Sequence, residues 1–182
     1  MKNIPTGSEE LSQSMPSQTV IGCLETLNQG LEFLEKLSPE DYTFIAAPHV
    51  SSSIGEHYRH WLDLFHAIRL DCDKIDYNVR RRGHHVEREI NTAKQEIKQL
   101  IEWLFELPAN RLEQIVIVET EVLLSQTCAQ EVQSSLAREL TFAALHATHH
   151  FAMIKVMASL KGIASETDFG LAPATVTYQR AQ

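Results

Sequence analysis

The sequence predicts an all-α protein built as a four-helix bundle, with a short β-hairpin before the last long helix. Four segments carry apolar residues three and four positions apart, the spacing that places them on one face of a helix. Proline, glycine and capping residues separate these segments. The chain has 182 residues, of which 43% are hydrophobic and 22% are charged, as in a single well-cored domain. We therefore expect residues 1–182 to form one domain.

The N-terminal part of the chain is predicted to contain an extension, a long helix and a short helical turn. Residues 1–16 are polar and end at Pro16, and we expect them to be flexible. The apolar face of the helix that follows is formed by Val20, Leu24, Leu27, Leu31 and Leu34. Ser38 precedes Pro39, as an N-cap precedes a first-turn proline, so a short turn of helix is expected there.

Two further long helices are predicted in the middle of the chain. Ser53 and Glu56 have the spacing of a capping box, which marks the start of the second long helix. The apolar face of this helix is formed by Ile54, Tyr58, Trp61, Phe65 and Ile68. The third long helix is expected from about Val86 to Leu107, just before Pro108. Its apolar face is formed by Val86, Ile90, Ala93, Ile97, Leu100 and Leu104.

The C-terminal part of the chain begins with a change of pattern. The stretch QIVIVETEVLL, residues 114–124, is rich in β-branched residues and predicts a short strand or hairpin. The fourth long helix is expected from about Ser134 to Lys161, ending at Gly162. Its apolar face is formed by Leu136, Leu140, Ala143, His146, His150, Met153 and Met157. The tail after it contains glycine and proline, and we expect it to wrap over the helices.

The composition argues against several classes of protein. The formal net charge is −8, whereas nucleic-acid binders usually carry a basic surplus. No apolar run approaches the roughly 20 residues of a membrane span, and the acidic N-terminal stretch does not resemble a signal peptide. We expect a cytoplasmic protein that binds neither nucleic acid nor membrane. Cys23, Cys72 and Cys128 are widely spaced, which predicts neither a disulfide framework nor a thiolate zinc site.

Two histidines of the fourth long helix form a candidate metal-binding pair. His146 and His150 are four residues apart, so their side chains share one helix face about 5–6 Å apart at Cβ. That spacing lets two imidazoles bind one ion at roughly 2.0–2.1 Å. The alternative is that they are core histidines satisfied by hydrogen bonds. His149 lies about 100° from His150 and is expected to point elsewhere.

The second long helix offers several candidates for a third ligand. His57 lies within the apolar face and His60 at its edge, so helical phase alone favours His57 and leaves His60 open. His66 is expected to be exposed. Asp63 could orient a ligand imidazole through its free N–H, and the alternative is an ordinary surface aspartate. Glu56, Tyr58 and Arg59 are close enough in sequence to contribute to the rim of a pocket, although we assign no catalytic residue.

Three segments resemble the DinB/YfiT-like superfamily: SSIGEHYRHWLD, residues 52–63, SSLARELTFAALHATHHFAMI, residues 134–154, and DFGLAPATVTY, residues 168–178. The resemblance covers about residues 20–178. It implies a four-helix bundle that binds a divalent ion, nickel or zinc, through one histidine of the second helix and two of an HxxxH pair. Carried over, it names His60, His146 and His150 as metal ligands. We follow it and keep His57 in reserve.

The resemblance implies a metal-dependent enzyme that activates a thiol or a water. Three imidazoles leave a coordination position open, which suits an S-transferase or a hydrolase acting on a small molecule, with a low-molecular-weight thiol as a second cofactor. Arg80, Arg81 and Arg82 of the run RRRGHH could bind an acidic thiol, or form a solvated loop. One alternative function is a non-catalytic, dimeric metal- or ligand-binding stress-response module. The other is a protein without a metal. We expect a homodimer.

Overall fold

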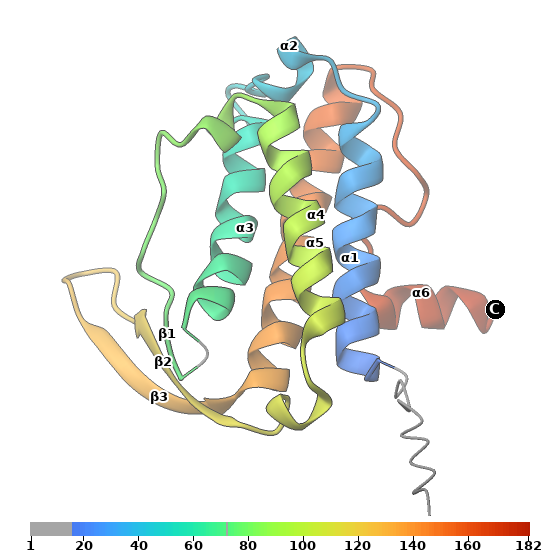
Figure 1. Cartoon of the computed structure of the whole chain (residues 1–182). Coiled ribbons are helices and arrows are strands. Elements are labelled where there is room, and N and C mark those ends of the chain that lie inside the picture. The colour runs from blue at the N-terminus through green and yellow to red at the C-terminus, as the bar shows by residue number, and fades with distance from the viewer. Residues whose placement is uncertain (1–15, 72) are drawn as a thin grey trace, which may run out of the picture.

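The computed structural model describes residues 16–71 and 73–182, and the chain there is mostly helical (Figure 1). The predicted extension, apart from Pro16, and Cys72 lie outside the described residues. Six α-helices, two 3-10 turns and three strands occur in this part of the chain. In chain order they are α1 Gln18–Leu34, α2 Pro39–Tyr42, α3 Ile54–Leu70, β1 Lys74–Asp76, η1 His85–Glu87, α4 Ile90–Glu106, η2 Ala109–Arg111, β2 Ile115–Glu121, β3 Ala129–Ser135, α5 Leu136–Leu160 and α6 Pro173–Arg180.

The four long helices α1, α3, α4 and α5 pack around one hydrophobic core. Each of α1 and α3 contacts both α4 and α5, so the four close on themselves (Figure 1). Large side chains of α3 fill the centre of the core, among them Tyr58, Trp61 and Phe65, each of which is fully buried.

Among the helices of residues 16–71 and 73–182, none combines the length and apolarity that crossing a membrane requires.

The predicted helix starts are confirmed where a side chain caps the backbone. Ser38 accepts a hydrogen bond from the Asp41 N–H at the start of α2, and Ser53 accepts one from the Glu56 N–H at the start of α3. Both are full capping boxes, because the acidic side chain accepts in return from the serine N–H. Helix α5 begins after Ser135, its N-cap.

The third long helix starts later than the sequence pattern predicts. The chain makes a 3-10 turn, η1, around Val86, and α4 begins only at Ile90. Tertiary contacts hold this break: the Tyr42 hydroxyl donates to the Val86 carbonyl at 2.6 Å, and the Glu87 side chain accepts from Arg59. The apolar residues of η1 and α4 still face the core as predicted, with Ile90 half-buried.

The predicted strand segment, residues 114–124, contains β2, whereas the partner strand of its hairpin, β3, lies beyond that segment. The hairpin belongs to a three-stranded sheet. Strands β2 and β3 pair antiparallel, with Val118 opposite Val132. Strand β1, which was not predicted, pairs parallel to β2 and places Ile75 opposite Val118. Ile75 is fully buried, so this short strand attaches the chain after α3 to the hairpin. The loop that follows β1 therefore starts from a fixed position.

The buried face of α5 is broader than the predicted one, and the tail packs partly as expected. Phe151 and Ile154 are fully buried, whereas Met153, a predicted core residue, is only half-buried. After Gly162 the tail covers α1 and α5 through Phe169, whose ring stacks between Phe33 and Phe151. It then forms α6, an unpredicted helix that projects away from the long helices (Figure 1).

Gly55 allows η1 to approach the start of α3, and this contact can be tested. A Cβ at Gly55 would lie 2.1 Å from the Glu87 carbonyl oxygen, so either α3 or η1 must shift to accept it. We predict that Gly55→Ala lowers the free energy of unfolding by about 1–3 kcal/mol in urea denaturation. Gly22→Ala is the control, because open space surrounds it in α1, and it should raise this free energy by about 0.5–1 kcal/mol. A Gly55→Ala protein as stable as the wild type would contradict this packing.

Candidate metal centre

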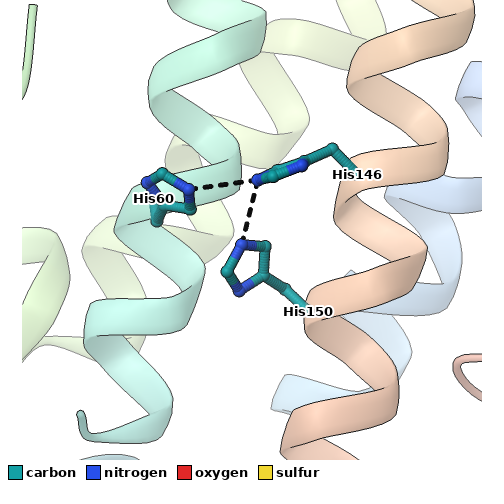
Figure 2. A group of neighbouring side chains, drawn as sticks. All are labelled: His60, His146 and His150. Atoms are coloured by element: carbon teal, nitrogen blue, oxygen red, sulfur yellow. Dashed lines mark hydrogen bonds between the residues drawn. The ribbon is translucent and has the colours of Figure 1, made fainter. Parts of the chain in front are cut away.

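Three histidines from two helices converge between α3 and α5 (Figure 2). The Nε2 atom of His146 lies 3.0 Å from Nε2 of His60 and 3.1 Å from Nε2 of His150. Figure 2 shows the two contacts meeting at one nitrogen of His146. All three side chains are half-buried. We call His60, His146 and His150 the histidine cluster. These are the three residues that the resemblance named.

Helix geometry and core packing together place the cluster. His146 and His150 share a face of α5 because they are four residues apart. The rotation of α3 is set by Tyr58 and Trp61, which are fully buried; the Tyr58 hydroxyl donates to the Gly30 carbonyl at 2.8 Å, and the Trp61 ring packs on Phe151. With these anchors fixed, the residues one position before them, His57 and His60, lie on the side of α3 that faces α5.

His57, the reserve ligand, lies beside the histidine cluster. Its Nδ1 is 2.8 Å from Nδ1 of His150, on the side of the ring away from His146. Its Nε2 is buried without a hydrogen-bond partner among the described residues. His57 therefore contacts the cluster through His150. Residues that bind the second ring nitrogen of a metal-binding histidine in this way fix the orientation of its ring.

The environment keeps the cluster histidines neutral at pH 7. Burial lowers the pKa of His60 to about 3 and that of His150 to about 2, and the nearby positive groups act in the same direction. Burial also lowers the pKa of His146, with smaller effects from His149 and Arg80. Neutral imidazoles are the form of histidine that binds metal ions.

The donor set and its spacing fit one divalent ion. Two nitrogens bound tetrahedrally at 2.0–2.1 Å lie about 3.3–3.4 Å apart. This is close to the separations of His146 Nε2 from His60 Nε2 and from His150 Nε2, and all three ligand atoms lie within 4.8 Å of one another. Within residues 16–71 and 73–182, no further His, Cys, Asp or Glu joins these three histidines. Protein sites with three ligands are usually open to a water or a substrate, whereas structural zinc sites have four.

Asp63 has neither of the roles that the sequence suggested. It is buried, with 5% of its surface exposed, and it accepts hydrogen bonds from Arg59 at 3.3 Å and from the Arg81 side chain at 2.6 Å. Arg81 also binds both carboxylate oxygens of Glu96, at 2.9 Å each. This ion-pair network fixes the loop before η1 against α3 and α4. Removing one partner of such a buried pair typically costs about 3–5 kcal/mol.

Other predicted site residues have structural contacts instead. The Glu56 side chain closes the α3 capping box. Tyr58 lies in the core and so does not form the rim of a pocket. Arg59 is bound by Asp63 and by Glu87 at 2.9 Å. His66, expected to be exposed, is half-buried and 2.9 Å from Glu96. His149, which was expected to point away from His150, is exposed and outside the cluster.

The contact between Arg80 and the cluster was not predicted from the sequence. The Arg80 guanidinium donates to Nδ1 of His60 at 2.7 Å, and Arg80 is itself exposed. The basic run that contains Arg80 was a visible signal, but nothing in its spacing showed which arginine reaches the histidines.

Comparisons with known proteins identify relatives of this chain. The sequence model of the DinB family matches residues 23–180. FK506-binding protein 5 of the fungus Rhizopus delemar is 29% identical over 108 residues, which make up 59% of this chain. The match spans only 28% of the length of that protein. No solved structure matches the chain.

The low pKa values predict a pH dependence of stability in the absence of metal. In the unfolded chain the cluster histidines titrate near pH 6.5, whereas in the folded chain they stay neutral to far lower pH. Unfolding therefore takes up protons, and stability that is present above pH 6.5 is lost as the pH falls toward the folded pKa values. The free energy of unfolding should drop by up to about 1.4 kcal/mol per pH unit for each histidine.

The measurement is urea denaturation at pH 7, 6 and 5 with a chelator present. His60→Gln combined with His150→Gln should make the dependence on pH shallower. His49→Gln is the control, since His49 is exposed and outside the cluster. If the free energy of unfolding changed equally with pH in the wild type and in the double variant, the cluster would not be the source of the pH dependence.

Proposed function

The chain belongs to the DinB family, and from this premise we propose that it is a metal-dependent enzyme acting on a small molecule. His60, His146 and His150 bind one divalent ion, nickel or zinc, since imidazole suits both. The reaction is an S-transfer from a low-molecular-weight thiol or a hydrolysis. Further parts of the proposal are that α1, α3, α4 and α5 form the four-helix bundle of one domain, and that the protein is a cytoplasmic homodimer.

One observation carries the proposal: three neutral imidazole nitrogens meet within hydrogen-bond distance although His60 is 86 residues before His146. A ring nitrogen of a neutral imidazole offers either one N–H or one lone pair, so Nε2 of His146 cannot satisfy both His60 and His150 by hydrogen bonding. Such convergence is expected when the nitrogens share a ligand.

The coordination position that three protein ligands would leave open suits activation of a nucleophile. A bound divalent ion lowers the pKa of a water or a thiol at its open position, so that hydroxide or thiolate is available near neutral pH. The chain's own part is to hold three imidazoles in fixed positions from rigid helices. His150 is oriented by His57, and α3 is held in its rotation by Tyr58.

A non-catalytic metal-binding module is the second candidate. It is favoured by the composition of the cluster, which includes no carboxylate among the described residues to act as an acid or base. The name of the fungal relative supports neither candidate, because the matching segment is a minor part of that protein. Turnover of thiols with electrophiles, measured on metal-loaded protein, separates the two.

Metal content is the direct test of the proposed site. Purified wild type incubated with nickel or zinc and then desalted should hold about one ion per chain by elemental analysis. His146→Ala combined with His150→Ala should hold none, because a single remaining imidazole cannot retain the ion. His149→Ala is the matched control from the same helix and should keep the ion, since His149 is outside the cluster. Wild type that stays metal-free would end the proposal.

A further inference from the structure

Arg80 differs from the other arginines near the histidine cluster. Arg59 and Arg81 are each held by two carboxylates. Among the described residues, no carboxylate forms an ion pair with Arg80, whose guanidinium contacts Nδ1 of His60 instead. Asp63 acts on the charge of Arg80 without forming an ion pair with it, so the exposed guanidinium can bind an anion once it leaves His60.

The contact between Arg80 and His60 fixes where His60 carries its proton. A guanidinium can only donate hydrogen bonds, so Nδ1 of His60 is the acceptor. A neutral imidazole with an accepting Nδ1 carries its proton on Nε2, and that nitrogen faces His146 at 3.0 Å. The contact thus belongs to the metal-free arrangement of the cluster.

A metal ion on Nε2 of His60 is incompatible with this contact. The proton of a neutral His60 would then lie on Nδ1, and two donors would face each other across 2.7 Å. His150 has no such conflict, because its Nδ1 faces Nδ1 of His57, and an imidazole nitrogen can either donate or accept. Loading the metal therefore releases Arg80 and leaves the pair of His57 and His150 in place.

We propose that Arg80, once released from His60, binds a carboxylate group of the small-molecule substrate or thiol beside the open side of the metal site. This rests on the proposed function. A divalent ion held by neutral imidazoles beside a guanidinium makes a positively charged site, and no carboxylate belongs to its group of ligands among the described residues, so it favours an anion. The guanidinium fork matches a carboxylate in two parallel hydrogen bonds. Of the three arginines in the run, Arg80 is the one that fits.

The test uses zinc-loaded full-length protein and succinate as the carboxylate probe, titrated by calorimetry at constant ionic strength. Arg80→Gln should weaken succinate binding by about tenfold to a hundredfold, the worth of a hydrogen-bonded charge. Arg82→Gln is the matched control, because Arg82 is exposed, lies two residues away, and its substitution removes the same charge. The succinate affinity of Arg82→Gln should stay within about threefold of that of the wild type. Arg80→Gln should also bind zinc at least as tightly as the wild type, because no guanidinium competes for His60.

The outcomes separate this inference from the function on which it rests. Equal succinate affinity in all three proteins, or an equal loss in both variants, overturns the role of Arg80 while the metal site stands. Weaker zinc binding by Arg80→Gln overturns the release step. Wild type that takes up no zinc overturns the metal site and this inference together.

Discussion

The docking of α3 against α5 is the constraint on which the candidate site depends. Tyr58 and Trp61 are buried in the core, and the Tyr58 hydroxyl is tied to the backbone of α1, so α3 cannot rotate without exposing two large aromatic rings. Burying such side chains is worth about 1.5–3 kcal/mol each. That energy holds His57 and His60 toward His146 and His150, and the cluster follows from core packing.

A second constraint fixes what lies beside the histidines. The buried carboxylate of Asp63 holds Arg59 on α3 and Arg81 in the loop, and Glu96 on α4 binds Arg81 from the other side. This network anchors the loop one residue away from Arg80, which leaves the Arg80 side chain able to reach His60. The two neighbouring arginines therefore have different contacts: Arg81 is held by two carboxylates, whereas Arg80 contacts His60.

Local features of the sequence predicted much of the fold and most of the site. Capping at Ser38 and Ser53 depends on residues three positions apart, and the shared face of His146 and His150 depends on a spacing of four, so both could be read directly. The choice of His60 over His57 depends on how α3 turns toward α5. Helical phase alone favoured His57, and the family resemblance supplied His60.

Features that depend on distant contacts could not be predicted. Strand β1 is only three residues long and pairs with a segment about 40 residues further along the chain. The delayed start of α4 depends on Tyr42 and Arg59, and the burial of Asp63 depends on a loop that follows it in sequence. In each case a tertiary contact overrides a local pattern.

X-ray absorption spectroscopy of zinc-loaded protein is the most direct test of metal binding by His60, His146 and His150. We expect a shell of three imidazole nitrogens at about 2.0–2.1 Å and a further ligand from outside the chain, whereas sulfur at about 2.3 Å or a spectrum without imidazole scattering would rule out the three-histidine site.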